Sequence, residues 1–192
     1  MRKILCVDTE FTCFDNDAEQ KDLPQELIEF GIAVIDVDAL TIVKSGNYYV
    51  KNTRKPISEF NTTINHITQK MLDRQGLELQ HVSKLLVEKW GTMRRENPVV
   101  FFGNEPAWMR PDFEAKGVKY CFHDSPINIA DYLRFNFQGT KSLKRASQKK
   151  LAAYYGVEVV QPAHSAKADA ETLAKIVIAA IKAGDIWPAL AK

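Results

Sequence analysis

The chain has 192 residues, of which 45% are hydrophobic and 26% are charged. This length suits one domain with a sizeable core, and the composition excludes a disordered chain. The formal net charge is only +2, so no global basic field indicates nucleic-acid binding. A polyanionic partner would have to be held by local patches or by metal. We therefore expect a single domain over residues 1–192.

The cysteine pattern and the N-terminus indicate where the protein works. The three cysteines are scattered and odd in number, and none has a metal-ligand spacing. This pattern is typical of a protein in a reducing cytoplasm. The basic start, Met1-Arg2-Lys3, is followed by only four apolar residues before Asp8. That stretch is too short for a signal peptide or a membrane span. We expect a cytoplasmic protein that contacts no membrane.

Three apolar segments in the first part of the chain have the composition of strands. Residues 4–11 indicate a buried strand, and residues 27–36 and 40–50 are rich in β-branched and aromatic side chains. A short polar break joins the last two segments, which predicts a three-stranded antiparallel meander. Residues 15–24 and 56–65 are polar, and we expect loops there.

The rest of the chain alternates helices with a strand. Apolar spacing predicts helices at residues 68–74, 79–97, 142–155 and 166–182. Residues 99–102 form a short apolar strand, and a strand after a long helix implies a parallel crossover. Residues 127–137 give no clear pattern. The expected fold is an α/β mixed sheet, an antiparallel meander plus parallel strands, flanked by helices.

Two acidic residues alternate at the end of the first apolar segment. Because side chains on a strand alternate between faces, Asp8 and Glu10 point to the same side. Adjacent carboxylates repel each other and are costly to desolvate, and a divalent cation between them removes that cost. The pair suits Mg²⁺ or Mn²⁺, which prefer hard oxygen ligands. A solvated strand end is the alternative for such a pair taken alone.

A histidine and an aspartate lie about 155 residues further along the chain. His164 precedes the last predicted helix, and Asp169 lies in the first turns of that helix. Asp169 would supply another metal oxygen. His164 suits a general base that takes a proton from metal-bound water near neutral pH.

These motifs resemble a known family. Asp-x-Glu-x-Thr at residues 8–12 and His-x4-Asp at residues 164–169 are similar to the DEDDh 3′–5′ exonucleases, the RNase T and DnaQ-like nucleases with an RNase H-like fold. Further similar segments are residues 26–31, 65–68 and 142–143. From Pro126 to His164 the chain is most similar to the branch that trims RNA 3′ ends.

The resemblance implies a two-metal mechanism. Two Mg²⁺ or Mn²⁺ ions would hold the scissile phosphate, one generating hydroxide and the other stabilising the leaving 3′ oxygen. Asp8 would bridge both ions, and Glu10 and Asp169 would each ligate one ion or orient its waters. His164 would be the general base.

The family's remaining acid, after the central strand, has no direct counterpart. Two alignments place Pro106 or Met109 at that position, and neither side chain binds Mg²⁺. Glu105 lies at the strand end, where its longer side chain can turn back to the metal. Asp112 follows Pro111, and proline favours the first turn of a helix. We prefer Asp112 slightly over Glu105. Simple compensation of a helix dipole by Asp112, or loss of this ligand altogether, are the alternatives.

Substrate contacts are also implied by the resemblance. Phe11 and Thr12 would meet the terminal sugar and base, and His66 and Ile67 belong to a segment before a helix that would face the terminal nucleotide. Trp108 suits either base stacking or the core. A basic run suits either phosphate contact or a solvated helix face, and it comprises Lys141, Lys144, Arg145, Lys149 and Lys150.

The sequence thus indicates a metal-dependent 3′–5′ exonuclease that releases nucleoside 5′-monophosphates from single-stranded ends, with RNA favoured over DNA. Two alternatives remain open. One is a proofreading-type DNA exonuclease, and the other is a catalytically weakened nuclease fold that binds nucleic acid without cutting it. The sequence also leaves open that the protein forms a homodimer.

Overall fold

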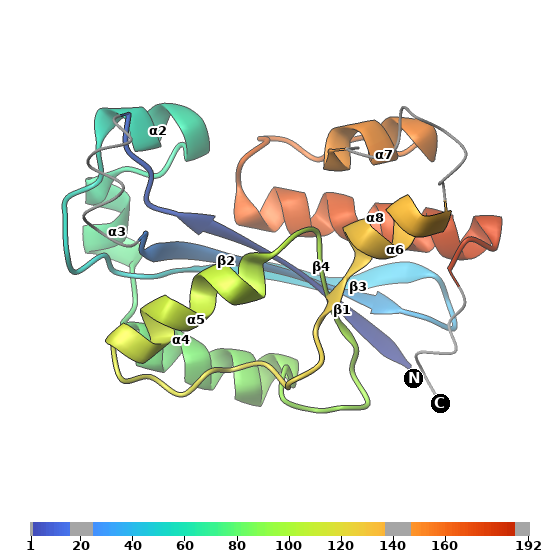
Figure 1. The fold of residues 1–192 in the computed structure, drawn as a ribbon, viewed down its shortest axis with the longest axis horizontal. Coiled ribbons are helices and arrows are strands. Elements are labelled where there is room, and N and C mark those ends of the chain that lie inside the picture. The colour runs from blue at the N-terminus through green and yellow to red at the C-terminus, as the bar shows by residue number, and fades with distance from the viewer. Residues whose placement is uncertain (1, 16–24, 137–146, 187–192) are drawn as a thin grey trace.

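The structure, a computed structural model, describes residues 2–15, 25–136 and 147–186. A five-stranded sheet of order β3-β2-β1-β4-β5 lies at its centre (Figure 1). Its strands are β1 (Lys3–Phe11), β2 (Leu27–Asp36), β3 (Thr41–Tyr49), β4 (Val99–Phe101) and β5 (Ile127–Asn128). Strands β1, β2 and β3 pair antiparallel, whereas β4 pairs parallel with β1 and β5 parallel with β4. The mixed sheet expected from the sequence is confirmed.

Helices cover both faces of this sheet. They are α2 (Glu59–Asn65), α3 (Gln69–Gln75), α4 (Leu79–Leu85) with its π-helical continuation η1 (Leu86–Trp90), α5 (Glu105–Ala115), α6 (Ile129–Asn136), α7 (Gln148–Tyr154) and α8 (Ala166–Ala183). The longest helix, α8, packs against β1, β2 and β3, while α4 and α5 lie on the opposite side (Figure 1). None of the helices in the described ranges has both the length and the apolar content needed to cross a bilayer.

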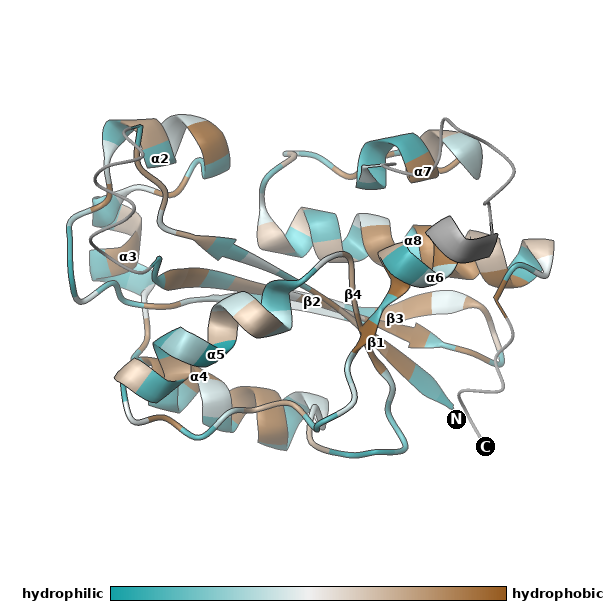
Figure 2. Ribbon diagram, viewed as in Figure 1, coloured by the Kyte–Doolittle hydropathy of each residue, from teal (hydrophilic) through white to brown (hydrophobic). Residues whose placement is uncertain are grey.

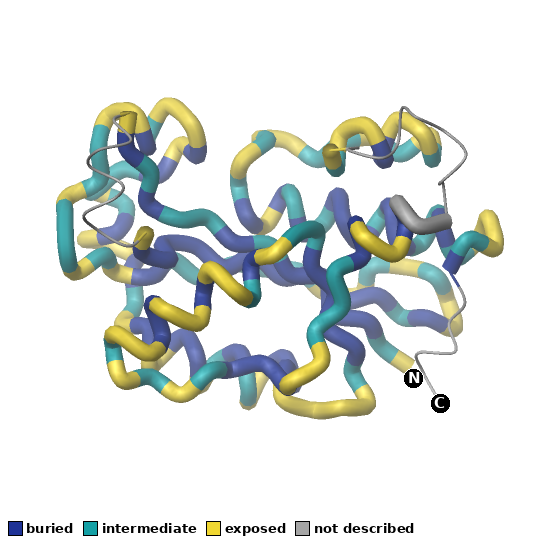
Figure 3. The backbone as a smooth tube through the Cα atoms, viewed as in Figure 1, coloured by how far each residue is buried: buried dark blue, intermediate teal, exposed yellow. Residues whose placement is uncertain are grey.

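Strand alternation divides the core into two layers. On β1, Ile4 and Cys6 face the helix α8 and pack in one cluster with Leu173 and Val177. The intervening residues, including Leu5, point to the other layer, which contains residues of α4 and α5. Apolar and buried residues accordingly line the strands and the inner sides of the helices (Figures 2 and 3). Asp8 and Glu10 continue the series of Ile4 and Cys6, so they belong to the α8 face.

The prediction of a loop over residues 56–65 is wrong, because helix α2 occupies much of this segment. Its sequence, with two asparagines and two threonines, has low helix propensity. Capping and tertiary contacts compensate for this: the Ser58 side chain accepts a hydrogen bond from the Asn61 N–H, and the Asn61 side chain accepts one from the Cys13 N–H. The helix is therefore specified by contacts with the end of β1 that local propensity does not reveal.

Other boundaries shift for local reasons. The helix expected over residues 79–97 ends at Trp90, where Gly91 adopts a left-handed conformation with φ 71°. The unassigned segment 127–137 contains β5 and α6. Of the helix expected over residues 142–155, the part up to residue 146 lies outside the described residues, as do residues 16–24 of an expected loop.

Candidate active site

Asp8 and Glu10 lie toward the end of β1, the central strand of the sheet. Asp8 pairs with Gly31 and Glu10 with Glu29 across β1 and β2. Both acids point toward the N-terminus of α8, and both are partly buried. The two carboxylates therefore lie between the sheet and the first turn of α8.

Gly31 allows α8 to approach the sheet closely. A Cβ added at Gly31 would lie 1.9 Å from the Ala166 carbonyl oxygen, so no other residue fits there without moving the helix. Glu29 then fixes the helix start, because its Oε2 accepts a hydrogen bond from the Ala166 N–H at 3.0 Å. The other oxygen of Glu29 accepts one from the Asn47 side chain at 2.6 Å. The first turn of α8 is thus held directly against the residues that pair with Asp8 and Glu10.

This docking brings Asp169 and His164 to the strand acids. Asp169 lies in the first turn of α8, and its Oδ2 accepts a hydrogen bond from the His164 N–H at 3.1 Å. His164 is exposed and adopts a left-handed backbone with φ 60°. One ligand atom from each of Glu10, His164 and Asp169 lies within 4.8 Å of the others. The structure therefore brings together two segments that lie far apart in the sequence.

Glu105 is the further acid in this group. It is the first residue of α5, directly beyond the end of β4, and is 6% exposed. Its carboxylate folds back over Gly103, where an added Cβ would lie 3.2 Å from Oε1. The charge of Glu105 acts on Asp8, and its Oε2 has no hydrogen-bond partner among the described residues. Met109, which one alignment placed at the acidic position, is fully buried in the core.

The acids of the site strongly disfavour one another's ionisation. Burial, together with the charges of Asp169, Glu10, Glu105 and Glu29, raises the pKa of Asp8 well above its usual value. Burial, Asp169 and Glu29 raise the pKa of Glu10 to about 8. Burial also raises the pKa of Asp169, although the His164 N–H opposes this.

These residues fit a divalent cation. One buried carboxylate oxygen has no hydrogen-bond partner, and several acids have raised pKa values. A bound cation would satisfy the oxygen and stabilise the ionised form of the acids. The donors are carboxylate oxygens, which Mg²⁺ and Mn²⁺ prefer. Asp8, Glu10, Glu105 and Asp169 are the residues that would hold such ions.

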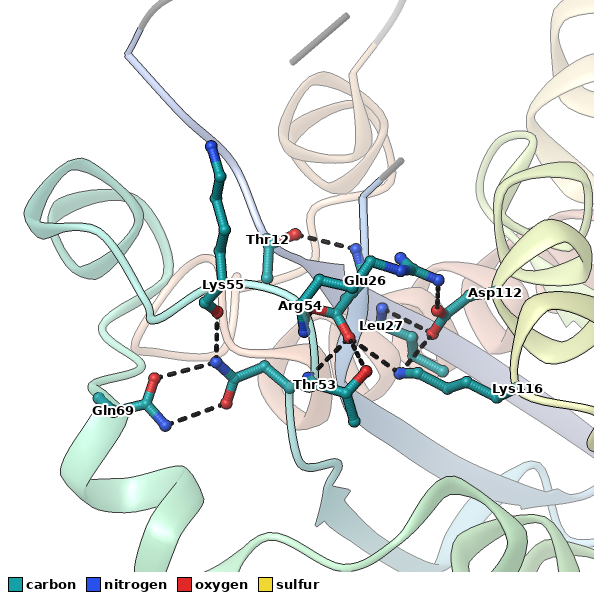
Figure 4. Close-up of polar contacts among 10 residues, drawn as sticks. Thr12, Glu26, Leu27, Thr53, Arg54, Lys55, Gln69, Asp112 and Lys116 are labelled. Carbon is teal, nitrogen blue, oxygen red and sulfur yellow. Dashed lines mark hydrogen bonds and ion pairs between the residues drawn. The ribbon is translucent and has the colours of Figure 1, made fainter. Parts of the chain in front are cut away.

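Asp112, the acid preferred from the sequence, belongs elsewhere. It is the eighth residue of α5, not its start, and it lies seven positions after Glu105, which is about 10 Å along the helix axis. Its carboxylate is buried and accepts bonds from Arg54 at 2.8 Å and Lys116 at 3.1 Å (Figure 4). Pro106 rather than Pro111 lies in the first turn of the helix, which is why the proline signal misplaced the helix start.

The ion pairs of Asp112 extend into a network that ties α5 to the sheet. Lys116 also bonds Glu26 at 3.2 Å, and Glu26 accepts hydrogen bonds from the backbone of Thr53 and Arg54 (Figure 4). The Leu27 N–H donates to Asp112 Oδ2 at 3.2 Å. Both oxygens of Asp112 are therefore engaged in holding the fold together.

Comparisons with known proteins agree with this geometry. The profile of the RNase T family, described as exonuclease, matches residues 5–177. This chain belongs to the RNase T exonuclease family. Sequence comparison found no significant match among curated proteins.

Solved structures of other nucleases share the fold of this RNase T family protein. The nuclease domain of 3'hExo, a DEDDh family member bound to rAMP, is 20% identical with a TM-score of 0.84, covering 95% of this chain and 93% of that one. Cell-death related nuclease 4 (CRN-4) is 22% identical with a TM-score of 0.79, covering 96% of this chain and 65% of that one. E. coli exonuclease I in complex with a dT13 oligonucleotide is 12% identical with a TM-score of 0.68, covering 94% and 41%.

Of the residues expected to contact substrate in this family member, some are exposed to solvent and others are buried. Phe11 is partly exposed and meets Trp108, which is 56% exposed, edge to face with ring centroids 6.3 Å apart. His66 is exposed at the C-terminal end of α2. By contrast, the Thr12 hydroxyl accepts a hydrogen bond from the Glu26 N–H, and Ile67 is buried in a small core cluster. The last two side chains therefore stabilise the fold in this structure.

The predicted basic run is only partly described. Lys149 and Lys150 are exposed on α7, whereas Lys141, Lys144 and Arg145 lie outside the described residues. The first residue of α7, Gln148, donates from its side chain to the Asp169 carbonyl at 2.7 Å. The two described lysines thus follow a residue that contacts the site.

Sequence reasoning missed Glu29 and Gln148 as residues that position the site. For Glu29 a signal existed, because it is a charged residue inside β2, a strand in which every residue except the last is buried. A charge in such a strand needs a specific partner. Gln148 gave no such signal, because its contact with Asp169 depends on how α7 folds against α8.

Proposed function

We propose that this RNase T family protein is a metal-dependent 3′–5′ exonuclease that releases nucleoside 5′-monophosphates from single-stranded ends, with RNA preferred over DNA. One observation carries the proposal. Ligand atoms of Glu10, His164 and Asp169, from the end of β1 and the start of α8, lie within 4.8 Å of one another, and Asp8 lies on the same face of β1 as Glu10. A solvated strand end would not gather partly buried acids and a histidine from two distant segments.

Asp8, Glu10 and Asp169 would hold the divalent cations beside the scissile phosphate. Glu105, at the start of α5, would take the place of the family's missing acid. When bound, divalent cations would supply the positive charge that draws the phosphate in and lowers the pKa of the attacking water. Glu105 is proposed in preference to Asp112, because it alone of the two acts on Asp8 and has an unpartnered oxygen.

His164 is the proposed general base. It is exposed, so its ring can meet a water that enters from solvent, and its backbone is tied to Asp169. The water oxygen forms a new bond to phosphorus as His164 takes the water's proton. The bond from phosphorus to the 3′ oxygen breaks, and that oxygen takes a proton from solvent. The product is a nucleoside 5′-monophosphate.

Phe11 and Trp108 are proposed to hold the terminal base. Their edge-to-face contact leaves Trp108 largely exposed beside the strand end that carries Glu10. Base stacking on an exposed aromatic ring contributes about 1–3 kcal/mol and tolerates any sequence. The preference for RNA is supported by the resemblance to the RNA-trimming branch and by the rAMP bound to 3'hExo, while the dT13 bound to exonuclease I supports the DNA alternative.

A digestion assay tests this function. RNA and DNA strands of the same sequence, labelled at the 5′ end, are incubated with the protein in Mg²⁺ or Mn²⁺. The proposal expects a ladder that shortens from the 3′ end, faster on RNA, and nucleoside 5′-monophosphate as product. His164→Ala should reduce the rate by roughly 10²–10⁴-fold while leaving metal affinity unchanged. Binding of the strands without cleavage in either metal would favour the weakened nuclease fold instead.

A further inference from the structure

A β-bulge lies where β1 reaches Phe11. The pairing of β1 with β2 shifts register between Glu10 and Phe11. Such a bulge bends the strand and re-aims the side chains beside it. Beyond the bulge, two hydrogen bonds of 2.8 Å join the two chains: the Thr12 N–H donates to the Glu26 carbonyl, and the Thr12 hydroxyl accepts from the Glu26 N–H. Thr12 and Glu26 therefore fix the orientation of the strand end that carries Phe11.

The side chain of Glu26 connects this strand end to α5 (Figure 4). Its Oε1 lies 3.2 Å from Lys116 Nζ, and Lys116 also pairs with Asp112, which in turn pairs with Arg54. Burial disfavours the charge of Glu26, but the backbone hydrogen bonds that it accepts and the nearby Lys116 ammonium outweigh burial and lower its pKa. We call these four residues the buried ion network, because their side chains are only 0–20% exposed.

Helix α5 also carries Trp108, one helical turn before Asp112. The Trp108 indole meets the Phe11 ring edge to face, with centroids 6.3 Å apart. The two rings thus come from separate elements, α5 and β1, and the buried ion network joins these elements. A rotation or shift of α5 relative to β1 would change the separation of the rings.

Stability alone is a weak reason for four buried charges. Ion pairs of this kind lose much of their attraction to desolvation, and well-packed apolar residues often stabilise a fold as well or better. Directional hydrogen bonds, however, hold their partners in one geometry, which apolar packing specifies less tightly. The network therefore suits a place in the fold where orientation matters.

We propose that the buried ion network, with Thr12 as its link to β1, positions Phe11 and Trp108 to receive the terminal nucleotide. Thr12 and Glu26 are then positioning residues, which act through Phe11 and do not touch the substrate. The inference rests on the proposed function, in which these two rings hold the terminal base.

Substitution of Thr12 tests the link. Thr12→Val keeps the shape of the side chain but cannot accept the Glu26 N–H, whereas Thr12→Ser keeps the hydroxyl. Thr12→Val should raise KM for a labelled RNA strand, and weaken the binding of adenosine 5′-monophosphate in Mg²⁺, by about fivefold or more, the share of base stacking. The value of kcat should change less than KM, because no residue around the metal is altered. Thr12→Ser should behave as the wild type.

Thr92→Val is the matched control. Thr92 is fully buried, and its hydroxyl donates to the Cys121 carbonyl, away from the buried ion network. Both valine variants should lower the melting temperature, since each loses a buried hydrogen bond. Only Thr12→Val should alter KM and nucleotide affinity. A Thr12→Val variant that loses stability but keeps both values, or a Thr12→Ser variant as impaired as Thr12→Val, would overturn the proposal.

Acrylamide quenching of Trp108 fluorescence follows the aromatic pair without any substrate. Comparison with the same chain carrying Trp108→Phe isolates the signal of this indole. Quenching of Trp108 should increase in Thr12→Val, where Phe11 shifts away, and stay unchanged in Thr92→Val. A wild-type chain that neither binds the nucleotide nor cuts RNA would contradict the proposed function, and increased quenching in Thr12→Val would still support the positioning of the two rings. Unchanged quenching in Thr12→Val would overturn it.

Discussion

Glu29 Oε2 accepts a hydrogen bond from the Ala166 N–H at 3.0 Å, and this bond joins the strand opposite Glu10 to the first residue of α8. Because Asp169 lies in the same helical turn, the bond fixes the position of Asp169 relative to Asp8 and Glu10. Glu29→Ala should therefore lower both stability and metal affinity. We expect a loss of about 1–3 kcal/mol in the free energy of unfolding, the cost of an unsatisfied buried group.

Ser45→Ala is the matched control for Glu29→Ala. Ser45 also links the sheet to α8, through a bond of 2.6 Å to Glu171, but it lies outside the acid cluster. Denaturant unfolding and Mn²⁺ titration should show a small stability loss and unchanged Mn²⁺ affinity for Ser45→Ala. If Glu29→Ala also kept its full Mn²⁺ affinity, the bond would serve the fold alone.

Gly31→Ala should push α8 away from the sheet. The added Cβ would overlap the Ala166 carbonyl, which is backbone and cannot rotate aside. We expect a destabilisation of about 3 kcal/mol, as for overpacking in a tight core, with a parallel loss of metal affinity. Gly46→Ala is the control, because its Cβ would lie 3.3 Å from the Trp90 ring, a side chain that needs to shift by only a few tenths of an ångström. Equal unfolding free energies of the two variants would show that the close approach is not needed.

Glu105 and Asp112 should respond in opposite ways to substitution. Glu105→Gln should reduce cleavage and metal affinity at least about tenfold while leaving the fold stable. Asp112→Ala should destabilise the fold by about 3–5 kcal/mol, because it removes the buried carboxylate to which both Arg54 and Lys116 are paired. Unfolding curves and Mn²⁺ titrations of both variants, measured side by side, separate the two roles. A stable Asp112→Ala variant that has lost its metal affinity would reverse the assignment.

Much of the fold was readable from the sequence because it rests on short-range periodicity. Alternation located β1, β2 and β3 within about one residue of their observed ends and placed Asp8 and Glu10 on one face. The helix α8 followed from its apolar spacing. The wrong predictions concern features that local periodicity does not determine. Helix α2 depends on a contact between Asn61 and Cys13. The start of α5 depends on which of two prolines lies in the first turn.

The site was predictable only where a motif carried it. Asp8, Glu10, His164 and Asp169 stand in two patterns with fixed spacing, and the structure brings these two segments together. The position of the Glu105 carboxylate depends on the turn at Gly103, over which the side chain folds back. No spacing rule encodes that turn, so Asp112 and Glu105 could not be separated without coordinates.

The acid cluster predicts an unusual dependence of stability on pH. Burial and neighbouring acids raise the pKa of Glu10 from 4.5 in an unfolded chain to about 8 in the fold. Between these values the folded state holds a proton that the unfolded state has released, so stability falls as pH rises from about 4.5 to 8. Asp8 and Asp169, whose pKa values are also raised, act in the same direction.

Melting temperatures of the metal-free protein between pH 5 and pH 8 measure this effect. They should fall toward pH 8, and added Mg²⁺ should restore the most stability at pH 8, where binding displaces the fewest protons. Glu10→Gln should flatten the curve. A metal-free protein whose stability rises steadily from pH 5 to pH 8 would contradict the clustering of the acids.

The most direct test of the whole account is a crystal structure of the chain soaked in Mn²⁺, with the ions located by anomalous scattering. The account predicts Mn²⁺ within about 2–2.5 Å of carboxylate oxygens of Asp8, Glu10, Glu105 and Asp169, with Asp112 still bound to Arg54 and Lys116. Manganese bound to Asp112, or no Mn²⁺ near Asp8 at saturating concentration, would contradict it.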